Sequence, residues 1–329
     1  MRILVTGSAG HLGEALMRSL RASAREAIGI DIAVSPYTDA VGSVADPDFV
    51  DRHMRGVRAV LHTATLHKPH VATHARQDFV DTNVTGTLNL LEAATRHGVE
   101  AFVYTSTTSA FGDALVPPPG APAAWITEDT VPVPKNIYGV TKSAAEDLCR
   151  LFHRNQKLPC VVLRTSRFFP EPDDSDAARA AFPDANLKAN ELLYRRVDLQ
   201  DVVDAHLLAI DRAGEIGFGR FIISATTPFV REDLADLRRD APAVVARHFP
   251  GYAAEYARHG WRMTPHIDRV YVNAAARHAL GWAPKYDFAH VLACLREDRD
   301  PRSALARTVG AKGYHAQTFA GVPYPVEAG

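Results

Sequence analysis

The stretch RILVTGSAGHLGEALMRSL, residues 2–20, carries the clearest structural signal in the chain. Residues 2–6 form a short run of apolar and β-branched side chains, which is typical of a buried strand. Leucines at every fourth position then predict a helix over residues 11–20. Three glycines stand between the strand and the helix: Gly7, Gly10 and Gly13. The stretch therefore predicts a strand, a tight turn and a helix in immediate succession.

A glycine-rich turn between a strand and a helix is the arrangement that binds a pyrophosphate. The first glycine permits the turn, the second lets the anion approach the main chain, and the third allows close packing of helix on strand. The anion would lie on the helix N-terminus, against His11 and Leu12. A tight turn with a purely structural role is the alternative interpretation.

The next predicted strand, residues 27–32, carries Asp31, roughly twenty residues beyond the glycine turn. A carboxylate at this position accepts the ribose hydroxyls of an adenosine and repels a 2′-phosphate. Ile32 would lie beside the same adenosine. Because no arginine follows directly to bind a 2′-phosphate, the pattern favours NAD over NADP. An ordinary aspartate at a strand end is the alternative.

Strands and helices continue to alternate along the chain. We expect strands at residues 41–44, 59–62, 101–104 and 158–164, and helices at residues 47–54 and 79–97. This alternation predicts an α/β protein with a doubly wound parallel sheet. Ligands in such sheets bind beyond the carboxyl ends of the strands. Two polar segments follow strands in this way: Thr63, Ala64 and Thr65, and Thr105, Ser106 and Thr107.

Tyr138 and Lys142 lie four positions apart in the segment NIYGVTKSAAED, residues 136–147. On a helix this spacing puts them on one face, one turn apart. A nearby ammonium lowers the pKa of a phenol by favouring the phenolate. With a hydroxyl such as Thr107 at the end of a neighbouring strand, the pair can exchange a proton with the oxygen of an alcohol or carbonyl.

Composition and charge exclude several classes of protein. The net charge is −1, with 47% hydrophobic and 23% charged residues, which argues against binding to nucleic acid or to a membrane surface. Three widely spaced cysteines and the absence of a leader-like segment predict a cytoplasmic protein. His70 and His74 have the spacing of a helical metal pair, but no carboxylate accompanies them and we expect no metal site.

Several motifs together resemble a known family. In chain order they are GSAGHLG from Gly7, Asp31, HTAT from His62, NVTGTLNLLEAA from Asn83, YTSTTSAFG from Tyr104, YGVTK from Tyr138 and LGWAPKYDF from Leu280. They are similar to the extended short-chain dehydrogenase/reductases of the sugar-nucleotide epimerase/dehydratase kind. The resemblance implies a Rossmann-type fold, NAD as cofactor, a small sugar-type substrate and a homodimer paired through the helices at 79–97 and 138–152.

The resemblance also implies roles for individual residues. Thr107, Tyr138 and Lys142 would be catalytic, with Tyr138 as the acid/base. Ser43 stands where the family has an aspartate beside adenine, and His67 where some epimerases have a lysine near the phosphates. The residues implied to bind NAD are Gly7, Gly10, His11, Leu12, Gly13, Asp31, Ile32, Ser43, Val44, Thr63, Ala64, Thr65, His67, Asn83, Thr105, Ser106, Tyr138 and Lys142.

The substrate side is predicted in less detail. Residues 1–165 would form the NAD-binding domain and residues 166–329, interleaved with it, the smaller α/β substrate-binding part. The candidates for substrate contact are Thr107, Thr108, Arg167, Asn190 and Arg195. A guanidinium at Arg167 suits a carboxylate or phosphate, and a solvated or ion-paired arginine is the alternative. Residues 171–194 are shorter than the nucleotide-binding insertion of the epimerases that the chain resembles.

We expect residues 114–135 to form a surface loop at the border of the active site. Helices are expected at residues 231–239 and 243–261, with the tail beyond residue 300 wrapping the surface.

Three hypotheses for function follow. The first is an NAD-dependent epimerase acting at a secondary alcohol of a sugar or sugar nucleotide. The second is a net dehydrogenase of a free sugar or sugar acid, like the uronate dehydrogenases. The third, from a different class, is a non-catalytic NAD-sensing protein.

Overall fold

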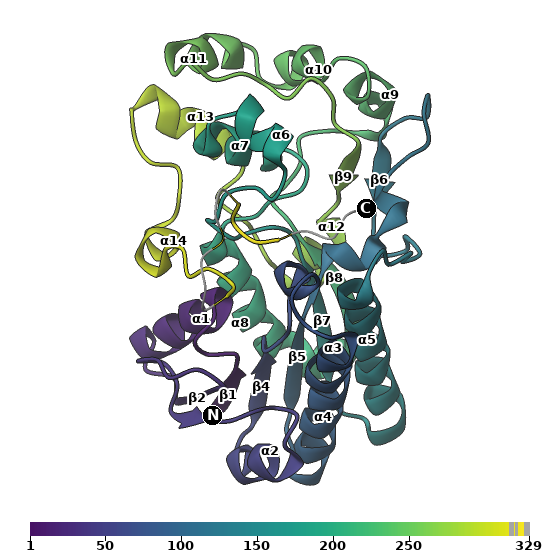
Figure 1. The fold of residues 1–329 in the computed structure, drawn as a ribbon, viewed down its shortest axis with the longest axis vertical. Coiled ribbons are helices and arrows are strands. Elements are labelled where there is room, and N and C mark those ends of the chain that lie inside the picture. Colours follow the sequence, from purple (N-terminus) through teal and green to yellow (C-terminus); the bar gives the residue numbers. More distant parts are fainter. Residues whose placement is uncertain (316–318, 320–321, 326–329) are drawn as a thin grey trace.

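A seven-stranded parallel sheet forms the larger part of the molecule (Figure 1). The computed structural model describes residues 1–315, 319 and 322–325. The strand order is β3-β2-β1-β4-β5-β7-β8. The strands are β1 (Ile3–Thr6), β2 (Ala27–Asp31), β3 (Ala40–Val41), β4 (Ala59–His62), β5 (Ala101–Thr107), β7 (Cys160–Thr165) and β8 (Phe218–Ile223). The predicted α/β class and doubly wound parallel sheet are confirmed.

The sheet order reverses at β1, which pairs with β2 on one side and β4 on the other. Thr6 is in register with His62 at the ends of β1 and β4. Loops from neighbouring strands diverge at such a reversal, and this leaves a crevice at the carboxyl edge of the sheet. The segments that follow β1, β4 and β5 therefore lie together along one edge.

Helices cover both faces of the sheet. On one face lie α1 (His11–Ala22), α8 (Leu199–Ile216), α12 (Ala274–Leu280) and α14 (Ala304–Val309). On the other lie α2 (Pro47–Met54), α4 (Gly86–Arg96) and α5 (Ile137–Gln156), with the short helix α3 (Arg76–Phe79) before α4. The two cores formed by these layers consist of buried apolar side chains from the helices and from alternate faces of the strands. Burial of this apolar area stabilises the layered arrangement.

The smaller part of the molecule lies beyond the carboxyl edge of the large sheet (Figure 1). It contains a two-stranded parallel sheet of β6 (Ala124–Ile126) and β9 (Arg269–Tyr271). Its helices are α6 (Asp176–Ala181), α7 (Asp184–Glu191), α9 (Leu234–Leu237), α10 (Ala241–His248), α11 (Tyr252–Arg258) and α13 (Phe288–Arg296). A separate apolar core, with Tyr256 and Phe288 fully buried, holds these helices together, except for α6, which contributes no buried residue.

Four local predictions need correction. The strand expected at 41–44 ends at Val41, because the chain turns at Gly42 to let Asp46 cap α2 with its carboxylate. Residues 114–135 contain β6 and are not only a loop. The helix expected at 231–239 is a 3₁₀ turn, residues 231–233, followed by the four-residue α9. The helix expected at 243–261 is two helices, α10 and α11, separated at Gly251, whose φ of +92° is strained for any side chain.

The tail beyond residue 300 does not simply wrap the surface. It forms α14, and residues 310–315 then run back toward the start of α1 (Figure 1, yellow). Tyr324 is 6% exposed and packs against the ring of Tyr314. Residues 316–318, 320–321 and 326–329 of this tail lie outside the described residues.

Candidate active site

The glycine turn has no room for side chains where a pyrophosphate would approach. A Cβ on Gly7, whose φ is +71°, would lie 2.7 Å from the main-chain nitrogen of Ala64. A Cβ on Gly13 would lie 1.9 Å from the carbonyl oxygen of Gly7. Gly10 is the N-cap of α1, and among the described residues no side chain caps that helix. The main-chain N–H groups at His11 and Leu12 are therefore suited to hold an anion, and the turn fits a dinucleotide.

The carboxylate of Asp31 is fixed at the rim of this turn. Its Oδ2 accepts a hydrogen bond from the N–H of Ala9 at 2.9 Å, and its Oδ1 accepts one from the N–H of Ala33 at 2.8 Å. Each oxygen keeps a further lone pair for a ribose hydroxyl. Ile32 is 73% exposed beside it. The arrangement suits an adenosine without a 2′-phosphate.

Ser43 and Val44 lie in the turn between β3 and α2. The Oγ of Ser43 accepts a hydrogen bond from the N–H of Ala45, and the carbonyl of Val44 accepts one from Asn89 of α4. These contacts hold the turn against α4, at the same edge of the sheet as Asp31.

Asn83 ties three segments of the site together. It lies in a π-helical turn, Val80–Thr85, that leads into α4. Its Oδ1 accepts hydrogen bonds from the N–H of Leu66 and the hydroxyl of Thr65, at 2.8 and 2.9 Å. Its Nδ2 donates to the carbonyl of Leu66 and to the hydroxyl of Thr141, both at 3.1 Å. The amide thus fixes the loop after β4 against α5, and Thr63 and Ala64 are fixed by the Thr6 hydroxyl.

The structure brings the three predicted catalytic residues together. Tyr138 and Lys142 lie in the first turns of α5, which Asn136 caps through its side chain, and Thr107 ends β5. Burial raises the pKa of Tyr138 to about 12, and a hydrogen bond with Thr107 opposes that rise. Burial lowers the pKa of Lys142 to about 7. Both groups are almost completely shielded from water.

Lys142 and its neighbours at the end of β5 are held by hydrogen bonds. The Nζ of Lys142 donates to the carbonyl oxygen of Thr105 at 2.7 Å. The hydroxyl of Thr105 lies 2.8 Å from Nε2 of His206, whose other ring nitrogen donates to the carbonyl of Val202. Burial lowers the pKa of His206 to about 4, so this histidine is neutral and accepts from Thr105. Thr108, at 7% exposure, begins the short 3₁₀ turn beyond Thr107.

A buried ion pair supports the site from behind. Glu146 lies one turn after Lys142 on α5 and accepts hydrogen bonds from Arg164 of β7, the shortest at 2.7 Å. The hydroxyl of Ser106 donates to the same carboxylate at 2.5 Å. Both charged side chains are 1% exposed. Sequence reasoning missed this pair, although Glu146 shares the helical spacing of Tyr138 and Lys142.

Aromatic rings line the space between Tyr138 and the glycine turn. The ring centroids of His67 and Tyr138 are 5.9 Å apart, and the ring of Phe169 is 5.6 Å from that of His67. Phe169 in turn lies 5.3 Å from His11 at the start of α1. The Tyr314 ring, from the C-terminal tail, lies 5.6 Å from Phe169. Sequence reasoning identified His67 and His11 but missed Phe169 and Tyr314.

The arginines expected to face the substrate are paired with acids of the chain. Arg167 contacts Asp173, Asp174 and Glu191, and Arg195 contacts Glu191 at 2.5 Å. Although burial opposes ionisation of Glu191, the surrounding arginines lower its pKa to about 2. The alternative weighed for Arg167, an ion-paired arginine, is therefore the observed state.

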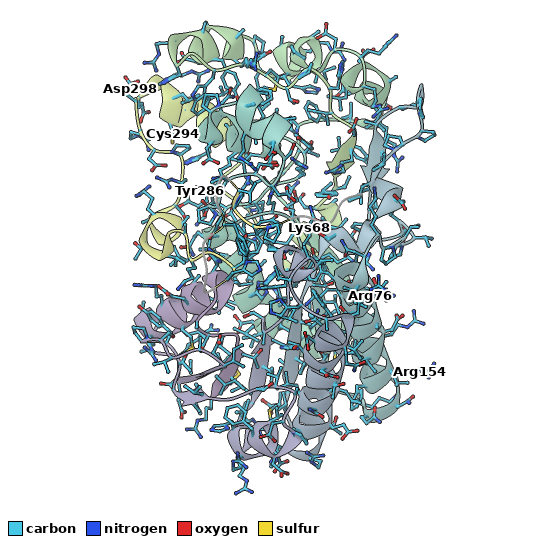
Figure 2. All side chains as sticks on the ribbon, in the orientation of Figure 1. Lys68, Arg76, Arg154, Tyr286, Cys294 and Asp298 are labelled. Carbon is cyan, nitrogen blue, oxygen red and sulfur yellow. The ribbon has the colours of Figure 1, made fainter. Side chains whose placement is uncertain are left out.

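Two further groups belong to this substrate side. Asn190 is fully buried and bonds to the Tyr256 hydroxyl and to the carbonyl of residue 262, and so holds α7 against α11. Lys68, near the junction of the two parts (Figure 2), pairs with Asp174. Lys68, like Arg167 and Arg195, thus has a carboxylate partner within the protein.

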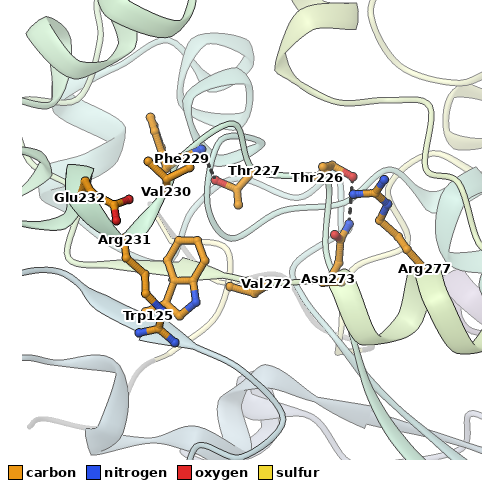
Figure 3. Close-up of a pocket in the computed structure, with 11 residues that line it drawn as sticks. Trp125, Thr226, Thr227, Phe229, Val230, Arg231, Glu232, Val272, Asn273 and Arg277 are labelled. Carbon is orange, nitrogen blue, oxygen red and sulfur yellow. Dashed lines mark hydrogen bonds between the residues drawn. The ribbon is translucent and has the colours of Figure 1, made fainter.

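A cavity in the smaller part of the molecule lies away from this site. It measures about 420 Å³ and is bordered by β6, the segment after β8 and the start of α12 (Figure 3). The guanidinium of Arg231 covers the ring of Trp125 there, 5.4 Å from its centroid. Its lining includes none of the residues predicted from the sequence: Trp125, Thr226, Thr227, Phe229, Val230, Arg231, Glu232, Val272, Asn273, Ala274 and Arg277.

His70 and His74 are neighbours, with ring centroids 4.9 Å apart. His70 uses both ring nitrogens in hydrogen bonds to the main chain, at His67 and Tyr314. In the described part of the chain, no group of three or more His, Cys, Asp or Glu side chains is arranged to hold a metal ion. Nor does any described helix combine the length and the apolar character that crossing a membrane requires.

Relatives of known name share much of this chain. A UDP-glucose 4-epimerase from Azospirillum brasilense is 26% identical over 348 aligned positions, which cover 93% of this chain and 91% of that protein. The uronate dehydrogenase of Pseudomonas syringae pv. tomato is 28% identical over 53% of this chain and 62% of its own length. The chain spans only 44% of the length of UDP-arabinose 4-epimerase 1 of Arabidopsis thaliana, at 25% identity over 49% of its own residues.

A solved structure shows the same fold. A short-chain dehydrogenase/reductase superfamily protein from Agrobacterium tumefaciens, crystallised with bound NAD, superposes with a TM-score of 0.64. It is 24% identical and covers 94% of this chain and 99% of its own. Residues 3–221 match the NAD dependent epimerase/dehydratase family. The glycine turn and Asp31 fit the cofactor of that family, and the predicted resemblance is confirmed: this chain belongs to the NAD dependent epimerase/dehydratase family, and its cofactor is NAD.

Proposed function

We propose that this protein is an enzyme that oxidises and reduces a secondary alcohol or carbonyl of a sugar or sugar derivative, with epimerisation as its main reaction. The observation that carries the proposal is the grouping of Thr107, Tyr138 and Lys142 at the carboxyl edge of the sheet that also holds the glycine turn. The full-length similarity to a UDP-glucose 4-epimerase supports epimerisation.

In the proposed mechanism, the side-chain oxygens of Thr107 and Tyr138 both bond to the reacting oxygen of the substrate. Tyr138 acts as the phenolate when it takes the proton of the alcohol as the carbonyl forms, and the phenol then returns this proton when the carbonyl is reduced. NAD, held by the glycine turn and Asp31, would supply the acceptor for the hydride from carbon and its return to the opposite face. Lys142 uses one N–H on the carbonyl of Thr105, which leaves two donors for the cofactor ribose and the phenolate. The aromatic wall of His67 and Phe169 keeps water from the reacting atoms.

The binding roles are part of the same proposal. The residues that we propose to bind NAD are the same ones that the sequence predicts, of which Gly7 is the first and Lys142 the last. Residues 1–165 would supply most of that site, and residues 166–329 most of the substrate side. Support for the interleaving of the two comes from β8 and α8, which follow residue 165 and yet belong to the sheet layer. Thr108, Arg167, Asn190 and Arg195 remain proposed substrate-side residues.

The test for epimerisation is direct. Purified protein is incubated with a UDP-hexose, and the sugars are separated by chromatography while NADH absorbance is followed. Interconversion of two epimers without net NADH formation supports the proposal. Steady accumulation of NADH with an oxidised sugar, and no epimer, contradicts epimerisation as the main reaction.

A second candidate is a net dehydrogenase of a free sugar or sugar acid. The observation in its favour is that Arg167 and Arg195 are already bonded to Asp173 and Glu191, so that a diphosphate would have to displace these carboxylates. The similarity to a uronate dehydrogenase supports the same candidate. Incubation with free uronates and NAD distinguishes it, since NADH would then accumulate in proportion to an aldonic or aldaric product. Absence of any turnover with either substrate class would favour the NAD-sensing hypothesis.

We also propose that the chain is a cytoplasmic homodimer. Its three cysteines are buried free thiols, which suits a reducing compartment. On α5, Val140 is 50% exposed and Leu151 is 39% exposed, and both would be covered by a partner helix. Light scattering on the purified protein tests the dimer. The variant Leu151→Arg is expected to run as a monomer, whereas Val131→Arg, an exposed apolar position outside α5, serves as the control.

A further inference from the structure

The C-terminal segment Lys312–His315 is attached to both sides of the candidate active site. The N–H groups of Lys312 and Gly313 both donate to Oε1 of Glu171, each at 2.9 Å. The Nζ of Lys312 pairs with Glu14 of α1 at 2.5 Å. Glu171 follows β7 and belongs to the substrate side, whereas Glu14 lies in the helix that begins at the glycine turn. The segment therefore bridges the cofactor side and the substrate side.

Glu171 is the centre of this attachment. Its side chain is 9% exposed, and the same Oε1 lies 2.7 Å from Nε2 of His11, the first residue of α1. Although burial opposes ionisation, the hydrogen bonds from His11 and from the segment lower the pKa of Glu171 to about 2. An ionised carboxylate only accepts, so His11 must donate its Nε2 proton to Glu171. The Lys312 amide, 3.1 Å from that nitrogen, therefore has Glu171 as its acceptor.

A second attachment lies nearer to Tyr138. The Nδ1 of His70 accepts from the N–H of His67 at 2.8 Å, so its proton is on Nε2. That Nε2 donates to the carbonyl oxygen of Tyr314 at 2.7 Å. Burial lowers the pKa of His70 to about 4, which keeps this tautomer neutral across the working range. The His70 imidazole thus anchors the segment to the loop after β4 by a directed hydrogen bond.

The Tyr314 ring lies between the two attachments. Its centroid is 6.0 Å from that of His11, 6.3 Å from that of His67 and 5.6 Å from that of Phe169. His11 marks the pyrophosphate end of the cofactor site, and His67 neighbours Tyr138 at the nicotinamide end. The segment therefore runs over the stretch that a dinucleotide would span between the glycine turn and Tyr138.

We propose that Glu171 is a positioning residue that latches residues 312–315 over the bound dinucleotide, and that the latched segment retains the cofactor between turnovers. The proposal rests on the cofactor part of the proposed function and not on the identity of the sugar. Retention of the cofactor is what an epimerase requires, because the same dinucleotide must return the hydride that it has taken.

The test is the rate at which NADH dissociates from the purified protein, followed by its fluorescence after dilution into excess NAD. Two variants remove the latch: Glu171→Gln, which removes the charge and one acceptor oxygen, and a chain that ends at Ala311. We expect both to release NADH at least tenfold faster than the parent, about 1.4 kcal/mol at 25 °C. Lys312→Ala, which keeps both main-chain bonds to Glu171, is expected to have a smaller effect.

The matched control is Glu100→Gln, which weakens an ion pair with Arg58 at the opposite edge of the sheet and should leave the rate unchanged. Thermal unfolding of each variant shows that it is folded, and Glu171→Asp should restore slow release in part. Dissociation from the shortened chain within twofold of the parent overturns the proposal. The proposal is also overturned if the shortened chain binds NADH more tightly than the parent through faster association alone. The segment would then compete with the cofactor. If the parent protein itself binds no NADH, this result contradicts the assignment of NAD as the cofactor and not the proposed role of Glu171.

Discussion

The Nζ of Lys142 lies 2.7 Å from the carbonyl oxygen of Thr105 and 4.2 Å from the centroid of the Tyr104 ring. The carbonyl accepts one of its protons, and the ring face offers an electron-rich surface to an ammonium. Neither partner carries a charge, so the cost of burying Lys142 is met only in part. This explains why burial lowers the pKa of Lys142 to about 7, where a small change in surroundings alters its charge.

Replacement of Lys142 should change the pH dependence of stability. The pKa of this lysine is about 7 in the folded chain and near 10.5 in the unfolded chain. Between these values the unfolded chain binds more protons, so the stability of the parent rises with pH, by at most about 1.4 kcal/mol per pH unit. Lys142→Met lacks this slope. The free energy of unfolding of Lys142→Met minus that of the parent should be largest below pH 7 and decline toward pH 10.5. Urea denaturation of both proteins across this pH range measures the difference. If the stabilities of the two proteins change with pH in parallel, the prediction is wrong.

Removal of the Tyr138 hydroxyl should abolish turnover and spare folding. We expect Tyr138→Phe to lower kcat by about 10²- to 10⁴-fold, the usual contribution of a general acid/base. NADH affinity and thermal stability should stay close to those of the parent, because the ring remains buried in place. Tyr286→Phe, in the substrate part (Figure 2), is the matched control and should keep full activity. Retained turnover in Tyr138→Phe would overturn the proposed mechanism.

The ion pair of Glu146 and Arg164 should matter for stability as a unit. Glu146→Leu leaves the guanidinium of Arg164 buried without its carboxylate, and we expect a loss of about 3–5 kcal/mol in the free energy of unfolding. The double variant Glu146→Leu/Arg164→Met should recover much of that loss, because only the partly exposed Arg220 then lacks the Glu146 carboxylate. Glu100→Leu, which breaks an exposed pair with Arg58, should cost less than about 1 kcal/mol. Equal losses in the single and double Glu146 variants would contradict this account.

Asp31 should control the choice of dinucleotide. Asp31→Ala removes the acceptor for ribose hydroxyls and also the hydrogen bonds to the N–H groups of Ala9 and Ala33. We expect kcat/KM for NAD to fall about tenfold or more, as is typical when a charged hydrogen bond is lost. The value for NADP should fall less or rise, because the repulsion of a 2′-phosphate is gone. An unchanged ratio of NAD to NADP would show that Asp31 does not select the cofactor.

Local patterns in the chain were enough to predict the layers of the larger part. The apolar run at residues 3–6, the glycines after it and the leucines of α1 each act within a few residues, and the observed β1 and α1 follow them closely. The same holds for the spacing of Tyr138 and Lys142 on α5. Where a local pattern was broken by a neighbour, the prediction was wrong: the strand expected through Val44 ends at Val41, because the chain turns at Gly42, where the Phe49 ring leaves no room for a side chain.

The remaining features depend on contacts between distant parts of the chain. His11 meets Glu171 across 160 positions of sequence and Lys312 across 301. No periodicity or spacing encodes such contacts, since they arise only when α1, the segment after β7 and the tail pack around one sheet edge. Burial then lowers the pKa of Lys142 and of His70, whereas hydrogen bonds from His11 and from residues 312–313 keep Glu171 ionised despite its burial. Residue order thus specified the sheet and the groups proposed to react, whereas the contacts of residues 312–315 with the site and its electrostatics came from tertiary packing, because desolvation depends on every neighbour in space.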